Sequence, residues 1–455
     1  MEEKKLSRKL KLGYGVGDLG GNLFFTMMGF YLLYYLTDIV KLPAALAGTV
    51  LFVGKAWDAI SDPIVGTLSD RTVSRMGRRR PYMFYGALFL LVFMTIVFFP
   101  VTNASVLFKV VWYAVMLCFL NTAYTMVNIP YSALAPELTA DYNERTVLNA
   151  YRNIFALLGT FSGALLIMPL ASVFPDVRLG WPFMGAVVGL IILITTFITV
   201  FTVREKPRTN TSSSKVQVLQ AYLSAMSLKS FRIALATWSL FIIGINVIQA
   251  ALVYYFTYVT GGRGSFSVTL MVLLSAALVS VPFWAFVAMR KGKRFAWNLG
   301  MLIFAVSVVL FVFLGPRVPL LVSYLFILVG GFGFSTQYAI PYAVLPDIVE
   351  YDFVKNGIRR EGVFYGIWTF MSKAGQALAS FMTGLILQFF GYVPPLADGA
   401  PAAQPDSALL GIRLLVGPIP AVFFIVGVIV FLFYPITREF YDRVIRMAEE
   451  RGSST

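Results

Sequence analysis

Apolar stretches of about twenty residues or more recur along the whole chain. A helix of that length crosses the ~30 Å hydrocarbon core of a bilayer, and helices satisfy their own backbone hydrogen bonds where no water is present. The sequence therefore predicts an all-α membrane protein with twelve spans, near residues 13–36, 44–68, 81–101, 106–134, 146–172, 181–203, 233–260, 266–289, 295–314, 319–345, 362–391 and 410–435.

Composition supports the membrane assignment. Only 13% of the residues are charged and 58% are apolar, whereas about 25% of the residues in soluble domains are charged. The first apolar run follows a Lys-rich tail and is longer than the core of a signal peptide. We therefore expect this run to be a span of the mature protein.

Positive charge is concentrated on one side of the predicted spans. If the N-terminus lies inside, the inner segments hold 28 of the 37 Lys and Arg residues and the outer segments hold six. This asymmetry follows the positive-inside rule and predicts cytoplasmic N- and C-termini in a multi-pass protein of the plasma (inner) membrane. The net charge of +15 is thus explained by topology and by contact with membrane lipids, and we expect no nucleic-acid partner.

The chain has one cysteine, Cys118, and no histidine. A disulfide within the chain, a Cys/His metal site and a His-based catalytic group are therefore impossible. We expect no enzymatic activity and no cofactor other than a coupling ion.

A faint internal repeat divides the chain into two halves. The segment Ile129-Pro130-Tyr131 near the end of the fourth span recurs as Ile340-Pro341-Tyr342 near the end of the tenth. Duplicated six-helix halves are typical of major facilitator transporters. The predicted domains are an N-terminal bundle (1–203), a central cytoplasmic loop (204–232), a C-terminal bundle (233–437) and a cytoplasmic tail (438–455).

The loop between the second and third predicted spans is rich in arginine. The pattern of a glycine, an Asp-Arg pair and a second glycine followed by a basic run resembles the cytoplasmic motif of the facilitators, with extra residues inserted. One interpretation is a basic loop that only sets topology. We also predict a gating role, with glycine allowing close helix packing and ion pairs locking one end shut, for Gly66, Asp70, Arg71, Gly77, Arg78, Arg79 and Arg80.

Two acids lie inside the second predicted span. Helical spacing places Lys55, Asp58 and Asp62 on one face. A charge near the bilayer centre costs roughly 2.5–3.5 kcal/mol, so such a cluster marks a functional site. Because two nearby carboxylates also repel each other, a proton, a metal cation or a lysine from elsewhere must neutralise them. The pattern predicts a cation site.

Polar residues recur at helical spacing in other spans. A stripe on the fourth span begins with Asn121 and Thr125, and it is either a structural seam or a cavity lining. Arg152 either grips a substrate or balances an embedded aspartate, and Asn22 suits an interhelical hydrogen bond equally well. The residues predicted to contact substrate are Asp18, Asn22, Tyr124, Asn128, Tyr131, Ser132, Arg152 and Tyr338.

Several of these segments together resemble the glycoside–pentoside–hexuronide:cation symporters of the major facilitator superfamily. The resemblance covers the whole chain and is carried by residues 57–63, by the Ile129-Pro130-Tyr131 segment with Pro136-Glu137, by Tyr151-Arg152 and by Lys373. It implies a twelve-helix major facilitator fold, alternating access and coupling to Na⁺ or H⁺. It also implies that Asp58, Asp62, Ser61 and Thr125 bind the ion with Lys373 nearby, and that Arg152 lies at the sugar site.

The departures from that family bear on the substrate. Melibiose permease, one of its members, has aspartates at the positions of Asn22 and Asn128 and an aromatic residue at the position of Ser132. Losing two anions near Arg152 favours an anionic substrate such as a hexuronide.

The sequence thus predicts a symporter that imports a glycoside, pentoside or hexuronide with a monovalent cation, working as a monomer. A carrier of a lysophospholipid-like amphiphile and a proton-coupled drug or metabolite antiporter are the alternatives. A channel or a membrane sensor is less favoured, because neither needs duplicated, gated halves.

Overall fold

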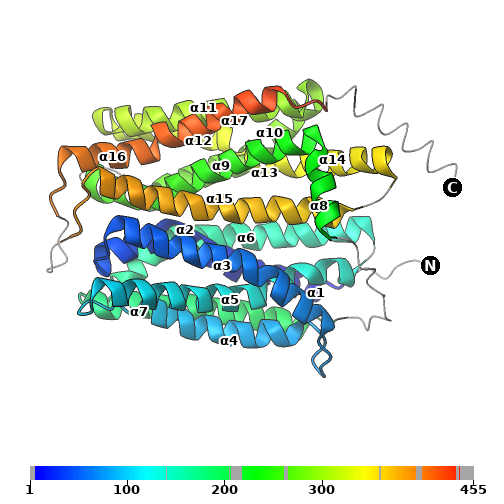
Figure 1. Cartoon of the computed structure of the whole chain (residues 1–455), viewed down its shortest axis with the longest axis horizontal. Helices are drawn as coiled ribbons and strands as arrows, with labels where there is room; N and C mark the ends of the chain where they lie inside the picture. Colours follow the sequence, from blue (N-terminus) through cyan, green and yellow to red (C-terminus); the bar gives the residue numbers. More distant parts are fainter. Residues whose placement is uncertain are drawn as a thin grey trace. The chain divides into compact units, whose positions relative to one another are not determined.

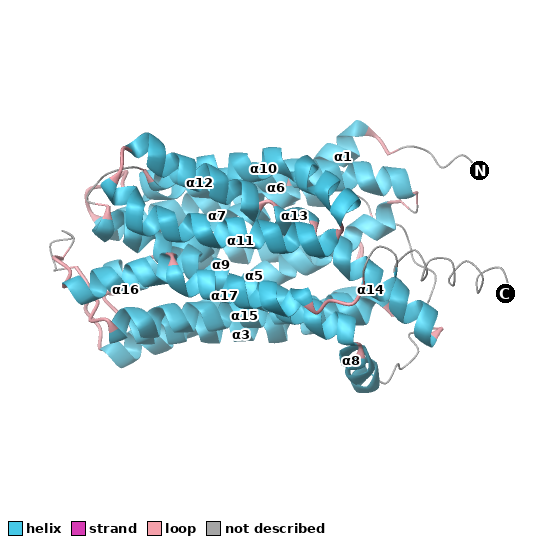
Figure 2. Ribbon diagram, turned by 90° about the horizontal axis from the view of Figure 1, so that it is seen from above, coloured by secondary structure: helices cyan, strands magenta, loops and turns pink. Residues whose placement is uncertain are grey.

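A computed structural model describes residues 6–139, 141–203, 205, 218–260, 265–357, 360–395, 402–436 and 440. These parts of the chain form helices and connecting loops, without a strand (Figure 2). The side chains of Pro136 and Glu137, the Ser/Thr-rich part of the predicted central loop, and the predicted tail apart from residue 440 lie outside the described residues. The prediction of an all-α protein is confirmed.

Eleven of the described helices are long and apolar enough to cross a membrane. The eleventh span of the sequence prediction is the exception. It corresponds to the helix α15 (Glu361–Phe389), which has 29 residues and is long enough to cross. Ser372, Lys373 and Gln376 lie in the middle of α15.

The described residues form two compact units, which draw on Met1–Thr211 with Ser380–Ala408 and on Ser212–Ala379 with Leu409–Thr455. In Figure 1 the long helices of each unit lie lengthwise beside one another. The helices of the first unit are α1 (Arg8–Gly15), α2 (Gly17–Tyr34), the π-helix η1 (Tyr35–Ile39), α3 (Ala44–Arg71), α4 (Arg80–Val97), α5 (Val106–Leu138), α6 (Tyr142–Ala171) and α7 (Val177–Thr202).

The second unit contains most of α15 and the remaining helices. These are α8 (Val218–Ser227), α9 (Lys229–Tyr254), the π-helix η2 (Tyr255–Val259), α10 (Phe266–Lys291), α11 (Lys293–Leu314), the short 3₁₀ helix η3 (Gly315–Arg317), α12 (Leu320–Phe334), α13 (Thr336–Ala339), α14 (Pro341–Asn356), α16 (Asp406–Val416, whose first residues belong to the first unit) and α17 (Pro418–Leu432). The predicted loop 204–232 is thus partly helical, because α8 and the start of α9 fall inside it.

The two units repeat one packing plan. In the first, α3 packs on α5, α4 packs on α5 and α7, and α2 packs on α7. In the second, α10 packs on α12, α11 packs on α12 and α17, and α9 packs on α17. These pairs join helices of equal rank in the two halves, so the faint sequence repeat corresponds to a repeat of helix contacts.

Proline and glycine interrupt the predicted tenth and twelfth spans. The tenth is split into α12, α13 and α14, with Pro341 as the first residue of α14, and α14 runs to Asn356 instead of ending at 345. The twelfth is split between α16 and α17 at Gly417 and Pro418. Proline lacks the backbone N–H that would continue the hydrogen bonding of the preceding turn.

Candidate functional site

The two acids of the second span converge on one hydroxyl of the fourth. The Oγ1 atom of Thr125 on α5 lies 3.1 Å from Oδ1 of Asp58 and 3.1 Å from Oδ1 of Asp62, both on α3. The two carboxylate oxygens are therefore at most about 6 Å apart, which is twice 3.1 Å. Ser61 adds a second hydroxyl 3.3 Å from that of Thr125. Two carboxylates and two hydroxyls thus form one oxygen cluster.

The cluster is shielded from solvent. Asp58 and Ser61 are each 3% exposed and Thr125 is 1% exposed, while Asp62 is partly exposed. The hydroxyl of Thr125 has a single proton, so it donates to one carboxylate at a time. Lys55, on the same face of α3, holds its ammonium 4.9 Å from the centre of the Phe25 ring.

The backbones of α3 and α5 approach closely one turn before the cluster. A Cβ atom on Gly54 would lie 3.2 Å from both the Nδ2 atom of Asn121 and the Cβ atom of Leu117, so only a small residue suits this position. The Asn121 amide donates to the Gly54 carbonyl at 3.0 Å. The spacing Gly54–Asp58 on α3 then matches Asn121–Thr125 on α5, which aligns Thr125 with the acids.

The remaining residues of the polar stripe on α5 lie beyond the cluster. Asn128 is partly exposed and Ser132 is exposed. The Ser132 hydroxyl donates to the Asn128 carbonyl at 2.8 Å. Part of the stripe is therefore a structural seam, at Asn121, and part of it is open.

Arg152 on α6 forms an ion pair with Asp18 on α2. Its Nε atom donates to Oδ2 of Asp18 at 3.0 Å, and Nη2 lies 3.4 Å from Oδ1. The guanidinium also lies 5.2 Å from the ring centre of Tyr131 and 5.9 Å from that of Tyr14. Of the two alternatives for Arg152, balancing an embedded aspartate is the one that the structure shows. The contact of Arg152 with a substrate stays a prediction.

Aromatic residues hold this ion pair in place. Tyr14 and Tyr131 stack with their ring centres 4.9 Å apart, and the Tyr131 hydroxyl donates to the Tyr14 carbonyl at 2.9 Å. Sequence reasoning missed Tyr14, which stands at the end of α1, four residues before Asp18. Tyr131 is 3% exposed and Tyr124 is 8% exposed, the latter stacked on Phe24 at 4.3 Å. Their substrate contacts stay predictions.

Asn22 is turned toward its own helix. Its amide donates to the Asp18 carbonyl at 2.9 Å and its backbone carbonyl accepts from Thr26 at 2.8 Å. Neither bond is the interhelical one that the sequence suggested as an alternative.

Lys373 and Tyr338 belong to the second unit, which also holds a stacked pair of tryptophans. Trp238 and Trp368 stack at 5.2 Å, and the Trp238 indole donates to Ser372, beside Lys373, at 2.6 Å. Both tryptophans are buried, whereas Tyr338 and Tyr342 are 48% and 59% exposed. The predicted roles of Lys373 and Tyr338 stay predictions.

The arginine-rich loop between α3 and α4 is tightly bonded. Arg79 pairs with Asp70, its Nη2 atom lying 2.9 Å from Oδ1, and donates to the carbonyl of Ala133 on α5. Arg80 donates to the Val200 carbonyl on α7 at 2.6 Å, whereas Arg71 is exposed. The expected ion pair is present, and its gating role stays a prediction.

Gly66 does not serve the close helix contact that the sequence suggested. A Cβ atom there would lie 3.5 Å from Ile129, an ordinary contact distance. Gly77 has a stricter requirement, since its φ angle is +104° and a Cβ atom would lie 2.9 Å from the Glu205 carboxylate. Only glycine tolerates both conditions.

Glu205, just after α7, was missed by the sequence analysis. Its carboxylate accepts backbone N–H bonds from Arg78, Arg79 and Arg80 at 2.8–2.9 Å, at the start of α4. A carboxylate at a helix N-terminus binds unsatisfied N–H groups and the positive end of the helix dipole. The available signal was the position of Glu205 as the first acid after the sixth span.

A comparable ion pair joins the start of α11 to α14 in the second unit. Lys293, the first residue of α11, donates to the carboxylate of Asp347 at 2.6 Å and to the carbonyl of Ala343 at 2.9 Å. Ala343 and Asp347 both follow the Ile340-Pro341-Tyr342 repeat. The sequence analysis did not predict this pair.

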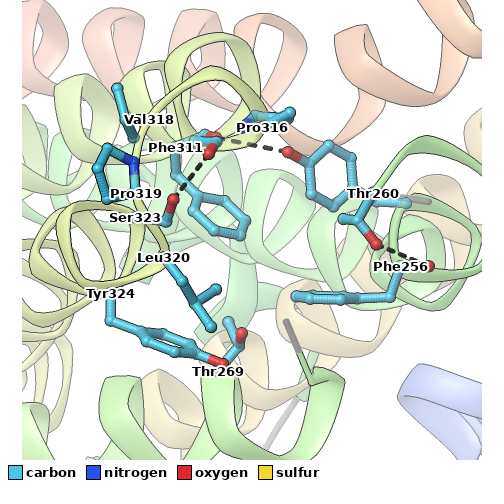
Figure 3. Close-up of a pocket in the computed structure, with 12 residues that line it drawn as sticks. Phe256, Thr260, Thr269, Phe311, Pro316, Val318, Pro319, Leu320, Ser323 and Tyr324 are labelled. Atoms are coloured by element: carbon cyan, nitrogen blue, oxygen red, sulfur yellow. Dashed lines mark hydrogen bonds between the residues drawn. The ribbon is translucent and has the colours of Figure 1, made fainter. Parts of the chain in front are cut away.

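A cavity of about 480 Å³ lies elsewhere in the second unit (Figure 3). Its hydroxyls bond to the backbone, since Ser323 donates to Gly315 at 2.7 Å and Thr260 donates to Phe256 at 3.0 Å. None of the predicted substrate contacts lines it. The lining residues include Phe256, Thr269, Phe311, Val318, Leu320 and Tyr324.

The family model for MFS/sugar transport proteins matches residues 13–438 of the chain. An uncharacterized symporter of Synechocystis is 32% identical, over 99% of this chain and 98% of that protein. A glucuronide carrier protein homolog of Escherichia coli is 27% identical over 98% and 97%. The sodium-dependent lysophosphatidylcholine symporter 1-B of Danio rerio is 26% identical over 96% and 88%.

A solved structure of a bacterial homolog of the lysosomal transporter Spinster shares the fold. It superposes with a TM-score of 0.66 at 13% identity, over 94% of this chain and 98% of that chain. Fold and family are those of a membrane transporter rather than an enzyme. The chain belongs to the MFS/sugar transport family and, within the major facilitator superfamily, to the glycoside–pentoside–hexuronide:cation symporters.

Proposed function

We propose that this protein is a cation-coupled symporter that imports a sugar-like solute by alternating access, with Asp58, Asp62, Ser61 and Thr125 as its cation site. The observation that carries the proposal is the convergence of two carboxylates on the Thr125 hydroxyl, with 3.1 Å to each acid, inside a membrane span. Oxygen atoms are the ligands that hard cations prefer. The full-length similarity to symporters supports the same reading.

The cation performs electrostatic work in this cycle. Two carboxylates within about 6 Å repel each other, and one added positive charge relieves the repulsion. A cation moving through 100 mV supplies ~2.3 kcal/mol, which supports roughly 40-fold accumulation of solute at ~1.4 kcal/mol per decade. Na⁺ and H⁺ both fit this arithmetic. The concentration of Lys and Arg in the inner segments supports cytoplasmic termini and the plasma (inner) membrane.

A glycoside, pentoside or hexuronide is the proposed substrate class, with Arg152, Asp18 and the open part of α5 as its contacts in the first unit. Because Arg152 is paired with Asp18, the pair offers donors and an acceptor at once, which suits hydroxyl groups as well as a carboxylate. The similarity to a glucuronide carrier protein homolog favours a uronide among the three classes.

Uptake by proteoliposomes tests the proposal. Gradients of Na⁺ or H⁺ are imposed separately, and accumulation of a labelled glycoside, pentoside, glucuronide or lysophospholipid is measured. We expect one gradient to drive uptake of a sugar-like solute. Asp58→Asn and Asp62→Asn should abolish that uptake, whereas the exposed Asp406→Asn control should leave it unchanged. Undiminished gradient-driven uptake in both site variants would refute the cation site.

An amphiphilic substrate is the second candidate, because one relative is a sodium-dependent lysophosphatidylcholine symporter. Uptake of the lysophospholipid and of none of the sugars would establish this alternative and reject a sugar-like substrate. Outward substrate flow under an inward proton gradient would instead identify an antiporter.

A further inference from the structure

One strip of the chain belongs to the first unit although its neighbours on both sides belong to the second. Ser380–Ala408 is grouped with the first unit, while Ala379 and Leu409 are grouped with the second. The strip contains the last turns of α15, the described linker residues that follow and the start of α16. The positive-inside orientation places it at the outer end. Its contacts with η1 and α3 therefore show how the outer end is held.

A helix seam provides the first set of contacts. Phe52 lies against Phe381, with ring centres 5.8 Å apart, and the Ala45 N–H donates to the Gln388 side chain at 3.0 Å. These contacts run in opposite order along the two segments at spacings of seven residues, so one face of α3 meets one face of α15 in antiparallel fashion.

Two glycines make the middle of the seam unusually close. A Cβ atom on Gly384 would lie 2.9 Å from the Cα atom of Gly48, and a Cβ atom on Gly48 would lie 2.9 Å from the Ser380 carbonyl. Backbone therefore packs directly on backbone, as small residues permit between membrane helices. Larger side chains at either position would wedge the seam apart.

A polar clasp closes the seam at its outer end. Asp38 in η1 is 2% exposed, and the Tyr392 hydroxyl lies 2.7 Å from both of its carboxylate oxygens. Thr37 donates to the same carboxylate at 2.5 Å. Lys41, whose φ angle is +63°, donates to the Pro395 carbonyl at 2.6 Å. A buried carboxylate is thus bonded to a hydroxyl of the strip.

We propose that Asp38 and Tyr392 form a latch that holds the strip on α3 and η1, and that this latch opens and re-forms during each transport cycle. The inference rests on the proposed function. The carboxylate of Asp38 accepts from Thr37 beside it and from Tyr392 of the strip. Separation of the strip breaks the Tyr392 bond, and water then solvates the separated groups, so the contact has a closed and an open arrangement. Losing a hydrogen bond to a charged group shifts such an equilibrium about 10- to 100-fold.

The latch acts on the helix that carries the acids of the cation site. Phe52 and Asp58 are six residues apart on α3, about 9 Å along the helix axis. A helix that packs against the strip at one end and against α5 at Asp58 transmits a shift at one contact to the other. Asp38 and Tyr392 are therefore positioning residues for transport, separate from the groups that bind the ion.

The rate of cysteine labelling tests the latch without substrate or cation. Cys118, the only cysteine, is replaced by serine, and Ala44→Cys, at a position 4% exposed beside the seam, reports access to an impermeant maleimide added outside. Tyr392→Phe removes one hydroxyl and keeps the ring. Tyr434→Phe is the matched control, because the buried Tyr434 hydroxyl has no hydrogen-bond partner among the described residues.

We expect Tyr392→Phe to raise the labelling rate about 10- to 100-fold over Tyr434→Phe, with Gly384→Ala changing it in the same direction. Equal rates in the two tyrosine variants would overturn the latch. Faster labelling of Tyr392→Phe in a protein that shows no cation-driven uptake would sustain the latch and reject the proposed function, so the two failures are distinguishable.

Discussion

The two units share a packing plan but differ in what fills it. The helices of the first unit carry charged side chains in its interior. These are the Asp58/Asp62 pair on α3 and the Asp18–Arg152 ion pair between α2 and α6. The second unit holds a stacked pair of aromatic rings, Trp238 on Trp368, near Lys373. The two units thus share their helix packing but differ in side-chain chemistry. The first unit suits the binding of an ion, and the second suits packing against an apolar or flat surface.

The two units carry similar ion pairs near the Ile-Pro-Tyr repeat, although their interiors differ. Arg79 binds the Ala133 carbonyl and Asp70, and Lys293 binds the Ala343 carbonyl and Asp347. In each case a cation at the start of a helix holds the backbone near the Ile-Pro-Tyr repeat. The contact between a cation and the backbone after the repeat is thus common to the two units, whereas the residues of their interiors differ.

The largest effect is expected from Arg152→Gln, which tests whether charge holds the interior of the first unit. The two side chains are 26% and 14% exposed, so Asp18 would be left uncompensated in a poorly solvated site. Breaking such a pair costs about 3–5 kcal/mol. Thermal unfolding in detergent should show a large loss of stability and the double variant with Asp18→Asn a partial recovery. An equal loss of thermal stability in the single and the double variant would contradict the pairing of Arg152 with Asp18.

Removing the cation of each ion pair, Lys293 or Arg79, should destabilise the protein to different extents. Asp347 is 9% exposed and Asp70 is 54% exposed at the side chain. Lys293→Met leaves a buried acid without its cation and should cost about 1–3 kcal/mol, whereas Arg79→Met should cost less because water solvates Asp70. Thermal unfolding of the two variants provides the ranking. A larger loss for Arg79→Met would show that the carbonyl contact outweighs the ion pair.

Thr125→Ala should weaken cation dependence by about tenfold, since one hydrogen bond to a charged carboxylate is lost. The cation concentration that gives half-maximal uptake measures the effect, and Thr125→Ser should restore it. Thr237→Ala, at a fully buried threonine of the second unit, is the matched control. A similar shift in the control would show that cation dependence does not arise from the first unit alone.

Trp368→Leu should raise the KM for substrate about two- to tenfold and leave cation dependence unchanged, because an aromatic contact contributes about 0.5–1.5 kcal/mol beyond its buried area. Trp284→Phe serves as a control in the same unit, since the Trp284 indole bonds to the Phe332 carbonyl. A change in cation dependence without a change in KM would contradict the assignment of ion binding to the first unit and of substrate contact to the second.

The smallest effect concerns Glu144, where Lys11 donates to the carboxylate at 3.2 Å and lowers its pKa. A lowered pKa means that the stabilisation is present above the ordinary pKa of glutamate and is lost as the pH falls through the folded-state value. Glu144→Gln should lower Tm by at most a few degrees at pH 7. That difference should vanish in acid, and a difference that persists there would assign the effect to something other than charge.

Hydrophobic runs and helical spacing anticipated a large part of this molecule. The spans, the shared face of Asp58 and Asp62, and the polar stripe of α5 follow from local period alone, because each concerns one helix. The Asp70–Arg79 pair was also within reach, since the two residues are close in sequence. The break in the tenth span was missed, although Pro341 and its neighbouring glycines signalled it.

Contacts between distant segments were a different matter. Periodicity assigned Thr125, Asp18 and Arg152 to polar faces, but which faces meet depends on how helices more than sixty residues apart pack together. The family resemblance had implied that Thr125 joins the two acids, and the folded chain shows it between them. Only the folded chain paired Arg152 with Asp18 and placed the Tyr392 hydroxyl on Asp38. A one-dimensional pattern therefore established that ionisable groups are embedded in the membrane, and three-dimensional packing decided which partners neutralise or orient them.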